Sequence, residues 1–136
     1  MADRPAVELT RLISRLPANA EIIGERAVAV TGIEIDSRAV RPGALFVAVR
    51  GARHDGHAFV SQAIANGAVA VVVETPAPQS VTVVAVPDSR RALSQLAAAF
   101  YDDPSRALDV VGITGTNGKT TTVQMVRAIL DRAGKP

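Results

Sequence analysis

The chain has 136 residues, of which 48% are hydrophobic and 21% charged, and its formal net charge is +2. This composition supports a folded core and excludes a disordered chain, and the scattered Lys and Arg residues give little support to nucleic-acid binding. The sequence has no cysteine, no signal peptide and no apolar run of about 20 residues, which predicts a cytoplasmic protein without disulfides or a membrane span.

Helical and extended patterns alternate over the first part of the chain. Apolar residues at helical spacing predict a helix over 9–16 that Pro17 ends. A short helix is expected over 60–64, with Asn66-Gly67 as its C-terminal cap. Apolar runs rich in β-branched residues predict strands over 28–35 (interrupted at Gly32), 44–49, 69–73 and 82–86.

A further helix is predicted after Pro87. Asp88 can cap its N-terminus, and Asp102-Asp103-Pro104 ends it. Its inward face is expected to consist of Leu93, Leu96, Ala97 and Phe100.

A glycine-spaced turn then separates a strand predicted over 110–113 from a last helix. The turn consists of Thr114, Gly115, Thr116, Asn117, Gly118, Lys119 and Thr120. Backbone N–H groups of such a turn, with the following helix N-terminus, can hold phosphate oxygens. The Lys119 ammonium can reach the terminal phosphates of a nucleotide, and the Thr120 hydroxyl suits a Mg²⁺ ligand.

The turn departs from the usual phosphate-loop pattern. That pattern would need Gly at position 113, which is Ile113, and Gly112 lies one residue too far upstream. We therefore predict a tighter variant of the loop; the alternative is a Gly/Thr-rich turn before an ordinary helix. The inward face of that helix would be Val123, Val126, Ile129 and Leu130, with Gly134 past its end.

The alternation of strands and helices predicts an α/β fold. Pro87 marks the expected boundary between a small N-terminal α/β domain, residues 1–86, and the first strand, phosphate loop and helix of a parallel-sheet ATPase domain, residues 87–136. One strand and two helices are too few to complete such a domain. We therefore expect the chain to be the N-terminal piece of a longer enzyme and to be inactive alone.

Two blocks of sequence carry a resemblance to a known family. The loop T-G-T-N-G-K-T-T-T at 114–122 resembles the ATP loop shared by the Mur ligases and the folylpolyglutamate synthetases. The upstream block, with D-S-R at 36–38, P-G-A-L-F-V-A-V at 42–49 and D-G-H at 55–57, resembles the N-terminal domain of two kinds of Mur ligase. D-S-R and the F-Y-D-D-P-S at 100–105 are closer to the ligases that add the third residue of the peptidoglycan peptide.

This resemblance implies a UDP site in the N-terminal domain. By position, the substrate's UDP would contact Ile35, Ser37, Ala52, Arg53 and His54. The Ser37 hydroxyl could bond a uracil edge or a diphosphate oxygen, and Arg53 could bond the diphosphate bidentately.

Plainer interpretations of these residues remain open. Asp36-Ser37 could be a turn closing a strand, with Arg38 and Arg41 as solvated charges or with Arg38 as an internal partner of Asp36. His54 and His57 have no nearby Cys and few carboxylates, which favours a surface or hydrogen-bonded role over a metal site.

The resemblance also implies an activity. An ATP- and Mg²⁺-dependent ligase would add a diamino acid to UDP-N-acetylmuramoyl-L-alanyl-D-glutamate through an acyl phosphate, with Lys119 as a catalytic residue. Such an enzyme would have no nucleic-acid or membrane partner and would be monomeric. The alternatives are a ligase adding the terminal dipeptide, a UDP-sugar-binding module, or a plain phosphate-loop NTPase.

Overall fold

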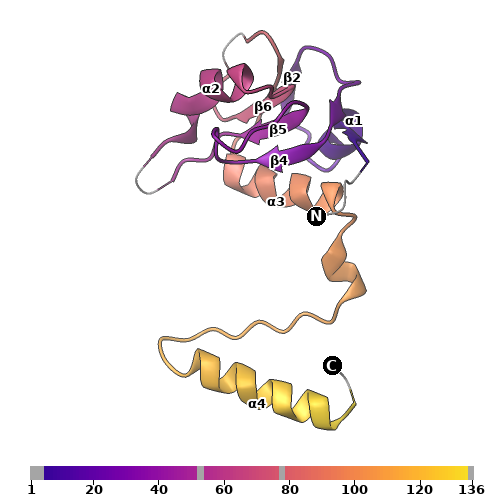
Figure 1. Cartoon of the computed structure of the whole chain (residues 1–136), viewed down its shortest axis with the longest axis vertical. Coiled ribbons are helices and arrows are strands. Elements are labelled where there is room, and N and C mark those ends of the chain that lie inside the picture. The colour runs from indigo at the N-terminus through magenta and orange to yellow at the C-terminus, as the bar shows by residue number, and fades with distance from the viewer. Residues whose placement is uncertain (1–4, 52–53, 77–78, 135–136) are drawn as a thin grey trace. The chain divides into compact units, whose positions relative to one another are not determined.

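The computed structural model describes residues 5–51, 54–76 and 79–134, and the chain divides into two compact units, Met1–Pro104 and Ser105–Pro136 (Figure 1). The first unit extends past the boundary expected near Pro87. The reason is helix α3 (Ser89–Phe100), whose apolar face packs against the sheet of this unit. The α/β class predicted from the sequence is confirmed.

A five-stranded sheet is the centre of the first unit. Its spatial order is β2 (Glu21–Ile23), β7 (Thr82–Ala85), β6 (Ala70–Val73), β5 (Ala44–Val47) and β4 (Gly32–Glu34). Neighbouring strands from β7 to β4 are parallel, and β2 pairs antiparallel with β7 at one edge. A separate antiparallel pair joins β1 (Val7–Glu8) to β3 (Ala29–Val30).

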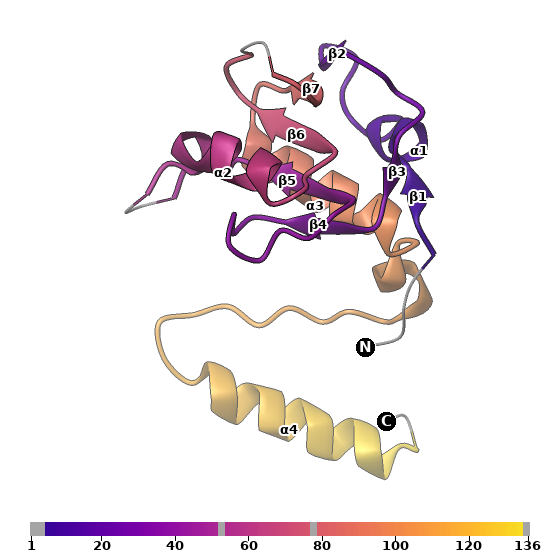
Figure 2. The same cartoon turned by 45° about the horizontal axis from the view of Figure 1, so that its top comes forward.

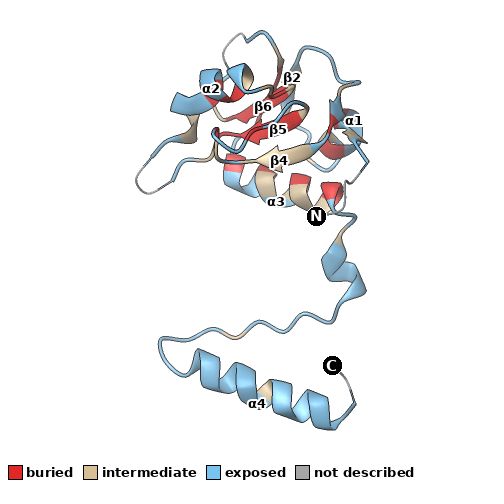
Figure 3. Cartoon of the chain, in the orientation of Figure 1, coloured by how far each residue is buried: buried red, intermediate tan, exposed pale blue. Residues whose placement is uncertain are grey.

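Apolar side chains cover both faces of the sheet, and Figure 3 shows β5 and β6 coloured as buried. Along β5, Leu45 and Val47 point to the face covered by α3 and by α1 (Leu9–Ile13), whereas Ala44 and Phe46 point to the opposite face. That opposite face is covered by α2 (Val60–Ala65), and Figure 2 shows α2 and α3 on different sides of the strands. The unbroken apolar runs of β5, β6 and β7 follow from this burial on both faces.

Two of the predicted elements need correction in detail. The strand expected over 28–35 is two strands, β3 and β4, separated at Thr31 and belonging to different sheets. The buried face of α3 is Ser89, Ala92, Leu96, Ala99 and Phe100, while Leu93 and Ala97 are only partly buried. The buried stripe therefore runs through Ala92 and Ala99 rather than through Leu93.

The turns that end α2 and α3 lie where the sequence predicts them. Gly67 follows α2 with a φ of 100°, and a Cβ there would lie 2.8 Å from Pro42 Cα, so the position requires glycine. After α3, Asp102 and Asp103 both have positive φ and pair with Arg11 and Arg15 at 2.7 and 2.8 Å. Short 3₁₀ segments lie at Gly56–Phe59 and Pro104–Ala107.

The second unit contains one long element, α4 (Lys119–Arg132). The strand predicted over 110–113 is wrong: in the described chain this stretch has no strand, and Val110 and Val111 are 72% and 69% exposed. A strand needs a neighbour to bond its backbone, and none pairs with this segment. The predicted inward face of α4 is also wrong, because none of the residues of α4 is buried.

No helix in the described part of the chain is both long and apolar enough to cross a bilayer.

Candidate functional site

A cleft of about 430 Å³ opens where parallel strands β4 and β5 end. In open α/β sheets the carboxyl ends of strands are the usual place for a ligand. The cleft is lined by Ile35, Asp36, Ser37, Arg38, Val49, His54, Gly56, Phe59 and Gln62. Three of the residues expected at a UDP site, Ile35, Ser37 and His54, are therefore brought together. The other two, Ala52 and Arg53, lie outside the described residues.

Ser37 is held in the wall of this cleft by helix α2. Its side chain is buried, with the residue 5% exposed, and its Oγ donates to Gln62 Oε1 at 2.7 Å. Its backbone carbonyl accepts from Asn66 Nδ2 at 2.8 Å. Gln62 and Asn66 are four residues apart, so both side chains leave the same face of α2. Ile35, by contrast, is 57% exposed at the mouth.

Asp36 and Arg38 form an internal ion pair in the same turn. Arg38 donates through its backbone N–H and Nε to Asp36 Oδ1, each at 3.0 Å, and through Nη2 to Oδ2 at 2.7 Å. These hydrogen bonds, first of all that of the guanidinium, lower the pKa of Asp36 to about 2. The prediction of Arg38 as an internal partner of Asp36 is confirmed.

The loop that carries His54 is closed by its own backbone. Gly51 N–H donates to the His54 carbonyl at 2.9 Å, and Gly56 N–H donates to the Val49 carbonyl at 3.0 Å. Arg50 and Asp55 face each other as an isolated bridge pair. His54 itself is exposed, so its ring can reach a ligand in the cleft.

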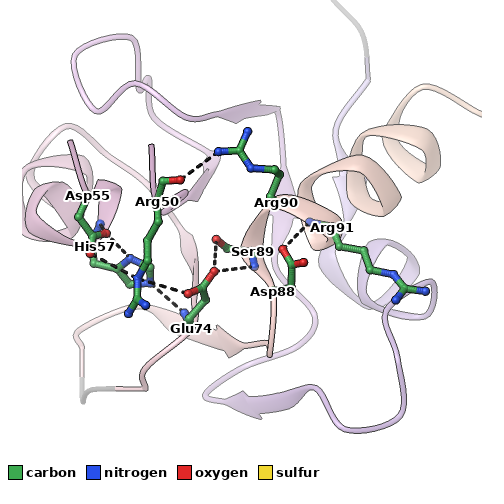
Figure 4. Close-up of polar contacts among 8 residues, drawn as sticks. All are labelled: Arg50, Asp55, His57, Glu74, Asp88, Ser89, Arg90 and Arg91. Atoms are coloured by element: carbon green, nitrogen blue, oxygen red, sulfur yellow. Dashed lines mark hydrogen bonds and ion pairs between the residues drawn. The ribbon is translucent and has the colours of Figure 1, made fainter. Parts of the chain in front are cut away.

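A polar network next to this loop joins the 3₁₀ segment Gly56–Phe59, the residue that follows β6 and the start of α3 (Figure 4). His57 Nε2 accepts from the Glu74 N–H at 2.9 Å, and its Nδ1 lies 2.6 Å from Asp55 Oδ1. These partners require a neutral imidazole that carries its proton on Nδ1 and donates it to Asp55. The prediction of a hydrogen-bonded role for His57 is confirmed.

Glu74 connects this network to helix α3. Its Oε1 accepts from the Ser89 N–H at 3.1 Å and from Ser89 Oγ at 2.9 Å, and these bonds lower its pKa. Its Oε2 lies 3.3 Å from Arg50 Nε, and Arg90 donates to the Arg50 carbonyl at 3.0 Å. Among the described residues, no group of three or more His, Cys, Asp or Glu side chains could hold a metal ion.

The second candidate site is the glycine-spaced turn before α4. Gly115 and Gly118 have φ values of 154° and 77°, and Gly118 is the N-cap of α4 without a capping side chain. Within the described chain, the N–H groups of residues 115–121 have no protein acceptor outside the helix. Lys119 folds back over the turn, and its Nζ donates to the Gly115 carbonyl at 2.6 Å.

This arrangement fits a phosphate ligand. Unsatisfied N–H groups at a helix N-terminus attract an anion, and the Lys119 ammonium already lies beside them. The Thr120 hydroxyl is exposed in the first turn of α4, where it can hold a Mg²⁺ ion, and the exposed Thr114, Thr116 and Asn117 complete the turn. Thr122 differs, because its Oγ1 donates to the Gly118 carbonyl at 2.9 Å and so bonds within the first turn of α4 instead of facing a ligand.

The sequence profile described as "Mur ligase family, catalytic domain" matches residues 29–101, more than half of the chain. The chain belongs to the Mur ligase family. The profile of the Mur ligase middle domain matches residues 113–136, which contain the whole glycine-spaced turn and α4. The two matches therefore cover the cleft and the turn separately.

Relatives of this Mur ligase chain are much longer than it is. A UDP-N-acetylmuramoyl-L-alanyl-D-glutamate–2,6-diaminopimelate ligase of Chlorobaculum tepidum is 52% identical over 96% of the chain, which spans 27% of that relative. A solved D-alanyl-D-alanyl ligase of the family from Acinetobacter baumannii is 32% identical, with a TM-score of 0.69 over 97% of this chain and 29% of that one. The MurF ligase of Thermotoga maritima in complex with ADP is 36% identical, with a TM-score of 0.57 over 74% of this chain and 23% of that one. The chain thus spans about a quarter of the length of the curated relatives that it matches.

Six of the residues that line the cleft were not predicted as ligand contacts, and two of them, Asp36 and Arg38, form the ion pair described above. Gly56 and Val49 close the loop, whereas Phe59 and Gln62 are three residues apart near the start of α2 and therefore share a helix face. That spacing is visible in the sequence. The strand end that this face meets is 25 residues away and cannot be identified from the spacing.

Proposed function

We propose that this chain carries the UDP-binding and ATP-phosphate-binding parts of an ATP-dependent ligase that joins 2,6-diaminopimelate to UDP-N-acetylmuramoyl-L-alanyl-D-glutamate. One observation carries the proposal: the 52% identity to a ligase of that name extends over 96% of the chain, through both the cleft and the turn. The use of ATP and of a nucleotide-linked precursor favours a cytoplasmic enzyme of peptidoglycan synthesis.

In this proposal the cleft beside Ser37 holds the UDP end of the substrate. Its wall combines apolar surface from Ile35 and Phe59 with polar groups from Ser37 and His54, a combination suited to a base and a ribose. Arg53, which lies outside the described residues, would bind the diphosphate.

The turn before α4 would hold the phosphates of ATP. Its N–H groups would bond the phosphate oxygens, and the Lys119 ammonium would offset negative charge that develops on the transferred phosphoryl group. Bound Mg²⁺, with Thr120 among its ligands, would supply further charge neutralisation. The structure of a family member in complex with ADP supports the binding of a nucleotide.

The proposed reaction depends on holding the reacting groups in position, and it needs no covalent bond to a protein side chain. The substrate's D-glutamyl carboxylate would attack the γ-phosphorus and release ADP, giving an acyl phosphate. The amine of diaminopimelate would attack the acyl carbon and expel phosphate, which leaves an amide. In this chain the cleft would fix the far end of the substrate, and Lys119 would act at the phosphoryl group.

The test uses the full-length protein and measures phosphate release. We expect release only when ATP, the UDP-dipeptide and diaminopimelate are all present. Lys119→Ala should lower kcat on the order of a hundredfold, the scale of one lost electrostatic donor. Arg132→Ala, which removes a cation from the other end of α4, is the matched control and should leave kcat unchanged.

Other outcomes would point elsewhere. Phosphate release without the UDP-dipeptide and amine would favour a plain phosphate-loop NTPase, and a loss below about threefold in Lys119→Ala would remove Lys119 from the mechanism. The likeness to the D-alanyl-D-alanyl ligase favours a second candidate, the ligase that adds the terminal dipeptide. Acceptance of D-alanyl-D-alanine by the UDP-tripeptide, with no use of diaminopimelate, would establish that candidate instead.

A further inference from the structure

We propose that Gln62 is a positioning residue that makes Ser37 an acceptor toward the ligand in the cleft. This inference rests on the proposed function, because it takes the ligand to be a uridine nucleotide. The observation that carries it is the 2.7 Å hydrogen bond from Ser37 Oγ to Gln62 Oε1, made inside the cleft wall.

The direction of this hydrogen bond decides what Ser37 can do. A serine hydroxyl has one proton and two lone pairs. Gln62 Oε1 has no proton to give, so the Ser37 proton is committed to it. Only the lone pairs of Ser37 Oγ are left for another partner.

Burial of Ser37 favours this hydrogen bond. Ser37 is 5% exposed, and a buried hydroxyl without a partner is costly, so the exposed Gln62 side chain supplies the acceptor that it needs. The second contact with α2, from Asn66 Nδ2 to the Ser37 carbonyl at 2.8 Å, holds the backbone of the same residue. Two side chains of one helix thus fix both the position and the polarity of Ser37.

The consequence separates the two partners that the sequence leaves open for Ser37. Diphosphate oxygens at neutral pH accept hydrogen bonds but do not donate them, so they cannot pair with the Ser37 lone pairs. A uridine offers donors at its imide N–H and its ribose hydroxyls. Ser37 therefore contacts the nucleoside part of the ligand, and the diphosphate is left to the loop that follows β5.

The experiment is an NMR titration of the 136-residue chain with UDP and with uridine. Backbone signals of residues 35–38 and 60–66 report on the cleft and separate it from any binding at the turn before α4. Gln62→Met removes the acceptor and should weaken both ligands by about fivefold, the scale of one hydrogen bond. Gln62→Glu keeps an acceptor at the same place and should retain affinity for uridine within about twofold.

A double-mutant cycle tests whether Gln62 acts through Ser37. Ser37→Ala should weaken UDP, and Gln62→Met should then add nothing, because the hydroxyl that it orients is gone. Additive losses would overturn the proposal, as would a loss for UDP without one for uridine. Ser61→Ala, an exposed change on the same helix, is the control and should leave both affinities unchanged.

The outcomes also distinguish this inference from the function on which it rests. If the native chain shows no shift of the cleft signals with UDP or uridine, the proposed UDP site and the role of Gln62 both fail. If the native chain binds but Gln62→Met binds equally well, only the positioning role fails. Should Gln62→Met not fold, Gln62→Asn withdraws the acceptor by one methylene and is expected to give the same loss.

Discussion

Asp36 shows how one residue of the cleft can be fixed by its nearest neighbours. Its carboxylate accepts three hydrogen bonds from Arg38, one from the backbone and two from the guanidinium. The pair lies in the wall of the cleft, with Arg38 mostly exposed. The hydrogen bonds between these two residues hold the turn in which Ser37 lies, and they involve no residue of the hydrophobic core.

The titration of Asp36 follows from this pair. The pKa of Asp36 is about 2, below its ordinary value of 3.8, so its contribution to stability is fully present above pH 3.8 and is lost as the pH falls through about 2. Arg38→Gln should raise this pKa, though not fully to 3.8, because the backbone N–H of residue 38 still donates. Carboxyl NMR shifts followed against pH measure both values. An unchanged pKa in the variant would contradict the assigned cause.

At this scale the sequence predicts partners that are close in the chain and misses those that are far apart. The Asp36–Arg38 pair spans two residues, and the Asx-type turn that produces it is a local preference. The Ser37–Gln62 bond spans 25 residues and depends on how α2 packs on the sheet. Ser37 was therefore expected in the site, whereas Gln62 was not.

Helix α3 is the element whose start is most completely specified. Asp88 accepts from the Arg91 N–H at 2.9 Å, and Glu74 accepts from the Ser89 N–H, so two carboxylates bond the first N–H groups of the helix. Negative charge at this end also suits the helix dipole. The apolar face that follows packs on the sheet, so the capped start of α3 also holds Glu74 beside Arg50.

Removal of the cap should destabilise the first unit. Asp88→Ala leaves the Arg91 N–H without its acceptor and should lower the free energy of unfolding by about 1 kcal/mol, the usual cost of a lost N-cap. Thermal unfolding followed by circular dichroism measures this change. Asp88→Asn keeps a capping oxygen and is the matched control. Equal melting temperatures for the native chain and Asp88→Ala would show that the cap does not contribute.

Among the elements, those with strong local signals were predicted and those that need a distant neighbour were not. The strands β5, β6 and β7 are continuous apolar runs, and Asp88 is a standard capping residue. The edge strand β2 has no such run and forms only because β7 lies beside it. The segment 110–113 has the composition of a strand, but its backbone finds no partner and remains irregular.

The two units of the chain differ in what stabilises them. The first has apolar clusters on both faces of its sheet, with Leu45, Phe46, Val71 and Val72 fully buried. Among the described residues of the second, none in α4 is buried (Figure 3), and Ile129 and Val123 are 67% and 50% exposed there. Tertiary packing supplies most of the stability of a protein helix, so the first unit has this source of stability and α4 does not.

Hydrogen exchange of the 136-residue chain should reveal this difference. An isolated helix shorter than about 15 residues is marginal in water, so the amides of α4 should exchange within about tenfold of the rate of an unfolded peptide. The amides of β5 and β6 should exchange only through global unfolding of the first unit and serve as the internal control. Protection of α4 equal to that of β6 would contradict the expectation and would mean that its apolar residues are covered in solution. Repeating the measurement at lower protein concentration would then identify the cover, because protection by a second copy of the chain is lost on dilution whereas protection within one chain is not.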